Sequence, residues 1–267
     1  MAGYADDHSL AHLLADTADS ISMSRFRALD LRVESKPDLT PVSDADTAVE
    51  QAIRSTLARA RPRDGVLGEE FGRADAAAGP GLRRWVIDPI DGTKNFVRGV
   101  PIWGTLIALL EGDTPVAGLV SAPALGRRWW AARGHGAYAG KHQHAATAIK
   151  VSGVRRWADA SLSYASLSGW ADTGRLEQIV DLSLSAWRSR AYGDFYGYML
   201  LAEGALEAMV EPELSLWDVA ALIPIVTEAG GSITDLTGRP PADKTAAIAT
   251  NGVLHETVLT ALTRSRR

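Results

Sequence analysis

The sequence predicts a protein that mixes helices and strands, with an α+β half over residues 1–143 and an α/β half over residues 144–267. In the first half, three apolar runs separated by turns follow one another, which indicates consecutive strands. In the second half, strand-like and helix-like segments alternate, as is typical of α/β domains. No repeat of fixed period is present, which argues against a solenoid.

Two helices are expected at the start of the chain. Apolar residues between Asp7 and Asp30 recur at helical spacing and predict an amphipathic helix. Two prolines predict a loop at 36–41, and the side chains from Ser43 to Asp46 are suited to capping a second helix.

Five strands are expected next, at residues 66–68, 84–87, 104–110, 115–120 and 127–132. Acids follow the first two at once, so Glu69 and Asp88 should lie at strand ends. Gly134 and Gly136 lack the rest of a dinucleotide-binding fingerprint and indicate a turn.

The second half begins after a polar, alanine-rich stretch at 139–150, which predicts a crossing between the halves. The elements expected after it are a strand at 161–165, helices at 173–184 and 194–203, a strand at 206–210, a helix at 216–229, a strand at 245–249 and a helix at 252–263.

Composition excludes several classes of function. The chain has 28 Lys and Arg against 32 Asp and Glu, and its basic residues are scattered, which argues against a nucleic-acid partner. It has no cysteine, so disulfides, thiolate metal sites and a cysteine nucleophile are excluded. Without a signal-like N-terminus or a long apolar run, we expect no membrane association and a cytoplasmic location.

The most informative segment is Asp88-Pro89-Ile90-Asp91-Gly92-Thr93. Pro89 fixes φ and Gly92 permits a tight turn, so that the two carboxylates can converge on one point. Carboxylate oxygens with open water positions suit Mg²⁺. Gly92 and Thr93 also indicate the start of a short helix, which would face an anion. The alternative is a solvent-exposed β-turn.

Other acids have both a functional and a structural explanation. Glu69 and Glu70 follow an apolar strand, where carboxylates are costly unless they are solvated, paired or bound to metal. Asp46 precedes a helix and could be a cap. Asp218 also opens a helix, for which Ser215 is a competing cap.

Taken together, the acids and their order resemble the inositol monophosphatase family. The resemblance is carried by Lys36, Asp46, Gly68-Glu69-Glu70, Asp88-Pro89-Ile90-Asp91-Gly92-Thr93, Trp217-Asp218 and Glu228-Ala229-Gly230-Gly231, and it spans nearly the whole chain. It implies a layered αβαβα sandwich of the inositol monophosphatase/fructose-bisphosphatase type. It also implies two or three Mg²⁺ ions, inhibition by lithium and a homodimer.

The resemblance assigns roles to individual residues. The implied metal ligands are Glu69, Asp88, the Ile90 carbonyl, Asp91 and Asp218. The implied catalytic residues are Asp46, Thr93 and Glu69, with Asp46 and Thr93 handling the attacking water. The residues expected to bind substrate are Asp91, Gly92, Thr93, Lys94, Arg190, Tyr192, Asp194, Glu211 and Asp218.

Segment 190–198 bears on the choice of substrate, because inositol phosphatases of the family typically have small neutral residues there. This chain has Asp194 and aromatic neighbours. With Glu211, Asp194 would favour a cationic substrate. A flat surface for a ring or ammonium group would come from Tyr192, Phe195 or Tyr196. These features resemble the histidinol-phosphate phosphatase branch, which takes L-histidinol phosphate in histidine biosynthesis. The alternative for Asp194 is capping of the helix at 194–203.

Two other functions remain open from the sequence. One is a phosphatase of the same fold acting on inositol 1-phosphate, fructose 1,6-bisphosphate or 3′-phosphoadenosine 5′-phosphate. The other is a non-catalytic regulatory binding protein, which the complete set of matched ligand positions disfavours.

Overall fold

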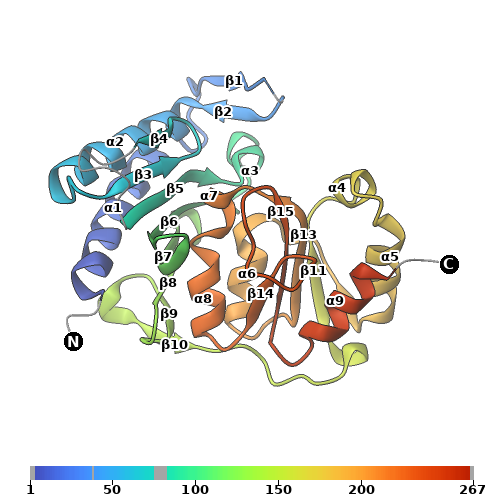
Figure 1. Cartoon of the computed structure of the whole chain (residues 1–267). Helices are drawn as coiled ribbons and strands as arrows, with labels where there is room; N and C mark the ends of the chain where they lie inside the picture. Colours follow the sequence, from blue (N-terminus) through green and yellow to red (C-terminus); the bar gives the residue numbers. More distant parts are fainter. Residues whose placement is uncertain (1–3, 38, 75–82, 265–267) are drawn as a thin grey trace.

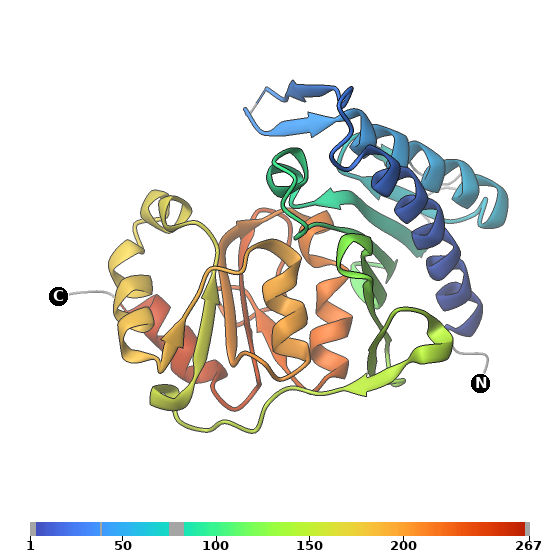
Figure 2. The ribbon, with the colours of Figure 1, turned by 180° about the vertical axis from the view of Figure 1, so that it is seen from behind.

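The computed structural model describes residues 4–37, 39–74 and 83–264. Five layers alternate between helices and sheets, in the order αβαβα (Figure 1). Helices α1 and α2 cover one face of the larger sheet, α6 and α8 lie between the two sheets, and α4, α5 and α9 lie beyond the smaller sheet (Figure 2). The layered sandwich predicted from the sequence is confirmed.

The larger sheet has eight strands in the order β10-β9-β8-β7-β6-β5-β3-β4. Neighbouring strands are antiparallel, except that β3 and β5 are parallel. The strands are β3 (Gly65–Gly68), β4 (Gly72–Ala74), β5 (Arg83–Asp91), β6 (Gly104–Glu111), β7 (Thr114–Ala122), β8 (Arg127–Ala132), β9 (Ala137–Gly140) and β10 (Thr147–Ile149).

The smaller sheet has five strands in the order β12-β11-β13-β15-β14. Strand β11 is parallel to both of its neighbours, whereas β15 is antiparallel to both of its own. The strands are β11 (Ser161–Tyr164), β12 (Arg188–Ser189), β13 (Ala208–Leu214), β14 (Ser232–Thr234) and β15 (Thr245–Thr250). A separate hairpin pairs β1 (Val33–Ser35) with β2 (Pro41–Ser43).

The helices complete the layers. They are α1 (Ala5–Arg25), α2 (Asp44–Ala60), α3 (Thr93–Val97), α4 (Leu167–Asp172), α5 (Leu176–Ser185), α6 (Asp194–Ala202), α7 (Leu216–Val219), α8 (Leu222–Glu228) and α9 (His255–Thr263), with 3-10 turns at Pro123–Leu125, Gln143–Ala145 and Trp157–Asp159. Within the described ranges, no helix is both long enough and apolar enough to cross a membrane.

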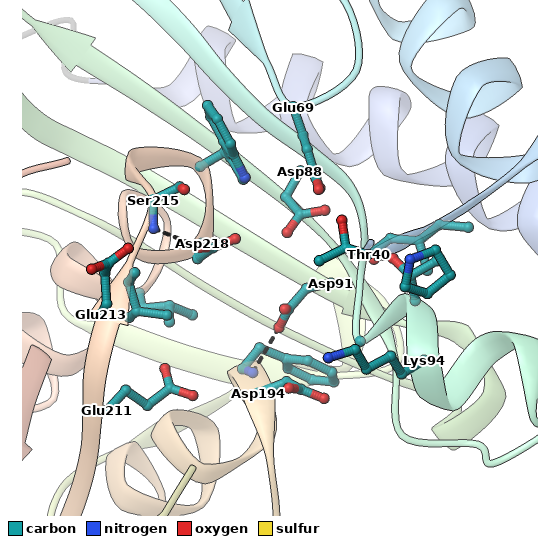
Figure 3. A pocket seen from close by; sticks show the side chains of 18 of the residues that line it. Thr40, Glu69, Asp88, Asp91, Lys94, Asp194, Glu211, Glu213, Ser215 and Asp218 are labelled. Carbon is teal, nitrogen blue, oxygen red and sulfur yellow. Dashed lines mark hydrogen bonds between the residues drawn. The ribbon is translucent and has the colours of Figure 1, made fainter. Parts of the chain in front are cut away.

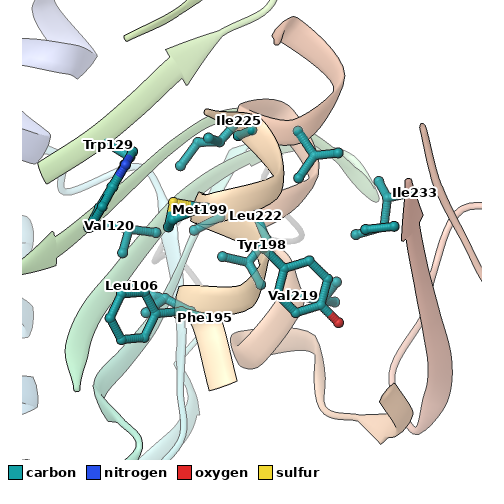
Figure 4. Packing of buried hydrophobic residues seen from close by; sticks show 14 of the residues in the cluster. Leu106, Val120, Trp129, Phe195, Tyr198, Met199, Val219, Leu222, Ile225 and Ile233 are labelled. Carbon is teal, nitrogen blue, oxygen red and sulfur yellow. The ribbon is translucent and has the colours of Figure 1, made fainter. Parts of the chain in front are cut away.

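Alternation along the strands divides the core between the layers. On β5, Trp85 and Ile87 face α1 and α2, whereas Val86 faces the middle helices, because successive side chains of a strand point to opposite faces. On the inner side, Phe195 and Met199 of α6 lie in one apolar cluster with side chains of α8 and the larger sheet (Figure 4). A single strand therefore contributes to two cores.

Glycines let the middle helices approach the sheets closely. A Cβ at Gly118 of β7 would lie 2.2 Å from the Ala221 carbonyl oxygen, and a Cβ at Gly197 of α6 would lie 2.4 Å from Met209 Sδ. At the other end of α8, the amides of Gly134 and Gly136 donate to the Glu228 carboxylate, each at 2.8 Å. These two glycines lie in a turn, as predicted.

Several predicted elements need correction. The first helix, whose end the sequence did not indicate, ends at Arg25. The stretch 139–150 contains β10 and part of β9, so the chain leaves the larger sheet only after Ile149. The predicted loop at 36–41 joins the strands of the small hairpin, and position 38 lies outside the described residues. The boundary at 143/144 stays a prediction.

Corrections in the second half concern helix lengths and short strands. The helix expected at 216–229 is split into α7 and α8, because Pro224 has no N–H to donate to the Ala220 carbonyl. The helix expected at 173–184 begins at Leu176, after the separate α4. Strands β4, β12 and β14 have only two or three residues and were not predicted.

We expect Gly118→Ala to destabilise the fold by about 1–3 kcal/mol, because backbone atoms of the α7–α8 junction must move to admit the methyl group. Urea unfolding followed by circular dichroism measures the change. Gly153→Ala is the matched control, since a Cβ there meets nothing within 4 Å. Equal unfolding midpoints for the two variants would contradict the close approach.

Candidate active site

One cleft gathers most of the residues that the sequence singled out. Its volume is about 580 Å³, and it lies where the ends of β3 and β5, the β1–β2 hairpin and the first turns of α3, α6 and α7 meet (Figure 3). The lining residues are Lys36, Thr40, Pro41, Glu69, Asp88, Ile90, Asp91, Gly92, Thr93, Lys94, Asp194, Phe195, Glu211, Glu213, Leu214, Ser215, Trp217, Asp218, Leu222 and Lys244.

A β-bulge directs Asp88 and Asp91 toward the same place. Strand β5 runs through both residues, so Asp88 is not at a strand end, and the alternative of a solvent-exposed β-turn does not hold for this described segment. Against β6, Asp88 pairs with Leu106 and Asp91 with Gly104, which leaves two residues of β5 opposite one of β6. In a regular strand, residues three apart face opposite sides, and the extra residue brings them back to one side.

The bulge and α7 together create a cluster of three acids. Asp88, Asp91 and Asp218 each offer a carboxylate oxygen, and these oxygens lie within 4.8 Å of one another. Asp91 Oδ2 accepts from the Phe195 amide, and Asp218 Oδ2 accepts from the Ser215 amide, each at 2.7 Å. Asp88 Oδ1 is buried and has no hydrogen-bond partner among the described residues.

Burial and crowding raise the pKa values of the cluster. The pKa values of Asp88 and Asp91 lie well above the usual range, first because burial disfavours charge and then because neighbouring carboxylates repel it. Burial raises the pKa of Asp218 to about 7, although the Ser215 amide opposes the shift. Such a cluster is favourable in its ionised form only with cations nearby.

One cation comes from the β1–β2 hairpin. Lys36 Nζ donates to Glu69 Oε1 at 2.7 Å and to Glu70 Oε1 at 2.8 Å. Burial lowers the pKa of Lys36, but the hydrogen bonds to the two glutamates outweigh it and raise the pKa above its ordinary value. Burial raises the pKa of Glu70 to about 7. Two hydrogen bonds from Lys36 therefore hold the β1–β2 hairpin against Glu69 and Glu70, which follow β3.

Asp46 connects helix α2 to the start of α3. Its Oδ2 accepts from the Ser43 amide at 2.8 Å and the Ser43 hydroxyl at 2.6 Å, and Thr93 Oγ1 donates to its Oδ1 at 3.3 Å. Thr93 Oγ1 also lies 3.0 Å from the Ile90 carbonyl. Asp46 and Asp218 are each the third residue of their helix, and each forms a capping box with the serine that caps that helix. The capping box uses one oxygen of the carboxylate. The capping and functional interpretations are therefore compatible for both.

The opposite side of the cleft carries a second group of acids (Figure 3). Asp194 opens α6 with φ +47°, makes no capping hydrogen bond there, and accepts from Asn95 Nδ2 at 3.2 Å. Glu211 Oε2 accepts from Tyr198 Oη at 3.0 Å, and burial raises the pKa of Glu211 to about 8. Gly193 and not Asp194 is the N-cap of α6, so the alternative interpretation of Asp194 as a helix cap is not supported.

Two predicted substrate residues lie elsewhere. Arg190 is exposed and donates to the Ser189 carbonyl, and Tyr192 lies beside Tyr196; neither lines the cleft. Conversely, no sequence pattern singles out Lys244, which lines the cleft and whose Nζ donates to Ser215 Oγ at 2.9 Å. Its loop is far from the acidic motifs in the chain and carries no pattern of its own.

Comparison with known proteins fits this arrangement of fold and cleft. Residues 7–267 match the inositol monophosphatase family. The chain belongs to this family. The inositol monophosphatase fold is also seen in the extragenic suppressor protein suhB from Bartonella henselae, which has a TM-score of 0.87 and 28% identity and aligns over 98% of this chain and 100% of its own.

Two relatives in the inositol monophosphatase family are more similar in sequence. The histidinol-phosphatase of Streptomyces coelicolor is 59% identical over 97% of each chain. The histidinol-phosphatase of Mycobacterium tuberculosis is 56% identical over 96% of this chain and 98% of its own.

Without divalent metal, we expect the stability of the protein to fall as the pH rises from about 4.5 to about 8. In that range the folded state holds the Glu211 proton more tightly than the unfolded chain, whose carboxyl has the ordinary pKa of 4.5. Glu211→Gln should flatten this fall, which urea midpoints in EDTA measure. Glu213→Gln, at an exposed position of the same cleft, should keep it. Parallel curves for wild type and Glu211→Gln would count against the burial of Glu211.

Proposed function

We propose that this chain is a Mg²⁺-dependent histidinol-phosphatase, which hydrolyses L-histidinol phosphate to L-histidinol and phosphate. The observation that carries the proposal is identity of 59% and 56%, over nearly full length, to two proteins that bear this name. The cleft adds a chemical reason, because its acids occupy two separate sides and can serve a metal and a cationic substrate at once.

The charge of the cleft supports two divalent ions. Seven carboxylates and three lysines line it, and the four carboxylates proposed as metal ligands would together carry the four negative charges that two Mg²⁺ ions balance. The unpaired, buried Asp88 Oδ1 is a ligand atom without another use, and oxygen-only donors suit Mg²⁺. The proposed ligands are Glu69, Asp88, the Ile90 carbonyl, Asp91 and Asp218. A third ion stays a prediction.

Residues of the chain would prepare the attacking water and the phosphate. The single Thr93 hydroxyl proton can go to the Ile90 carbonyl or to Asp46. With the Ile90 carbonyl bound to metal, Thr93 would donate to Asp46, and its lone pairs would accept a hydrogen bond from water in the cleft. Asp46 would then hold the proton that the attacking water releases through the Thr93 hydroxyl. Gly92, Thr93 and Lys94 line the cleft beside Asp91 and would bind the phosphate oxygens. Bound Mg²⁺ supplies Lewis acidity and lowers the pKa of water.

The second acidic group would recognise the rest of the substrate. Asp194, Glu211 and Glu213 line the cleft away from Glu69, on α6 and β13 (Figure 3). L-histidinol phosphate carries an ammonium group and an imidazole, both of which carboxylates attract. Arg190 and Tyr192 do not line the cleft, and their contact with the substrate stays a prediction. A homodimer, lithium sensitivity and a cytoplasmic location stay predictions.

Hydrolysis of four esters in parallel tests the assignment. Phosphate release should be fastest with L-histidinol phosphate and slower with inositol 1-phosphate, fructose 1,6-bisphosphate and 3′-phosphoadenosine 5′-phosphate, and EDTA should abolish it. If histidinol phosphate were among the poorest substrates, the assignment would be wrong. A chain inactive on every ester with Mg²⁺ present would instead favour a non-catalytic binding role.

Asp194→Asn should raise KM for L-histidinol phosphate about tenfold, because a charge-assisted hydrogen bond to the ammonium becomes a neutral one. The asparagine keeps the shape of the side chain and an oxygen that can accept from Asn95. KM for inositol 1-phosphate, which has no ammonium, should change little. Equal losses on both esters would show that Asp194 shapes the cleft and does not select charge.

A further inference from the structure

Glu50 is a buried carboxylate that the proposed reaction does not use. It lies on α2, one turn after Asp46, and its side chain is fully buried. Its Oε2 accepts from the Glu70 amide at 2.8 Å, and its Oε1 accepts from the Phe71 amide at 3.2 Å. These two amides belong to the turn that directly follows Glu69.

Arg54 completes a clamp on the same turn. Its Nε donates to Glu50 Oε1 at 2.7 Å, and its Nη2 donates to the Gly72 carbonyl. The pair on α2 thus binds both amide donors and a carbonyl acceptor of residues 70–72. Before the turn, the Glu69 amide donates to the Ile87 carbonyl at 3.2 Å. Backbone contacts on both sides therefore fix Glu69.

Gly68 makes room for the clamp. A Cβ at this position would lie 2.0 Å from Glu50 Oε1 and 2.3 Å from its carboxyl carbon. Any larger residue would displace the Glu50 carboxylate from the turn. The glycine before the two glutamates is therefore required by the approach of Glu50 and not by a left-handed backbone.

We propose that Glu50 is a positioning residue, which sets the place of Glu69 relative to Asp88 and so the affinity of the site for divalent metal. This inference rests on the proposed metal-dependent function. A buried carboxylate is the suitable group, because two amides and a guanidinium need three acceptor contacts from two oxygens. Helix α2 thereby places both Asp46 and, through Glu50, the turn of Glu69.

The test is the affinity for Mn²⁺ alone, measured from free Mn²⁺ by electron paramagnetic resonance. Glu50→Gln replaces one oxygen by an NH₂ group, which must face the turn amides or Arg54, donor against donor. We expect its Kd for Mn²⁺ to rise about 10- to 100-fold, as for other partners that orient metal ligands. Near-ultraviolet circular dichroism confirms that the variant is folded.

Asp19→Asn is the matched control, because Asp19 is also a helical carboxylate paired with an arginine, Arg128, but it lies away from the cleft. It should lower the unfolding midpoint and leave the Mn²⁺ affinity unchanged. If Glu50→Gln does not fold, Arg54→Met is tested instead. This variant loses the hydrogen bonds of Arg54 to Glu50 and Gly72 but keeps the Glu50 carboxylate, so it should raise the Kd for Mn²⁺ by a smaller factor.

A folded Glu50→Gln or Arg54→Met variant that binds Mn²⁺ as tightly as the parent would overturn the inference. So would an equal loss of affinity in Asp19→Asn, since the effect would then follow stability alone. A parent chain that binds Mn²⁺ but hydrolyses none of the four esters would refute the proposed function and leave the role of Glu50 intact.

Discussion

Repulsion between buried carboxylates is the constraint on which the arrangement of this cleft depends. Asp88, Asp91 and Asp218 converge within 4.8 Å, and Glu69 and Glu211 lie in the same cleft. Burying like charges together is unfavourable unless donors or cations compensate. Much of the local structure consists of such compensation, from backbone amides at Phe195 and Ser215 to the lysines that line the cleft.

The compensating donors also hold the layers in register. The Phe195 amide belongs to α6, between the sheets, and its acceptor Asp91 belongs to β5 of the larger sheet. On the outer side, α2 places Asp46 against Thr93, which lines the cleft, and the Glu50 clamp against the turn after Glu69. With Glu211 on β13 of the smaller sheet, the site is the junction of four layers, and a shift of any one of them would change the distances between the acids.

Reaction and specificity are separated in space along this junction. The proposed metal ligands come mainly from β3 and β5, whose positions are fixed by sheet pairing and by α2. Asp194 and Glu211, which would recognise the substrate, come from α6 and β13 in the second half of the chain. Residues on α6 and β13 can therefore vary without disturbing the metal ligands, which is one way for a single scaffold to serve several phosphate esters.

The sequence by itself determined the layered fold, most of the longer strands and helices, and the acids around Asp88 and Asp91. The elements depend on local periodicity and capping, whereas the layered fold was implied by the resemblance that the ordered acids carry. The bulge that turns Asp88 and Asp91 to one side was decided by pairing with β6, which no local pattern encodes. No local pattern encodes the position of Lys244 in the cleft, the position of Arg190 outside it, or the short edge strands. Their positions follow from contacts between segments distant in the chain, where burial and register, and not propensity, set the outcome.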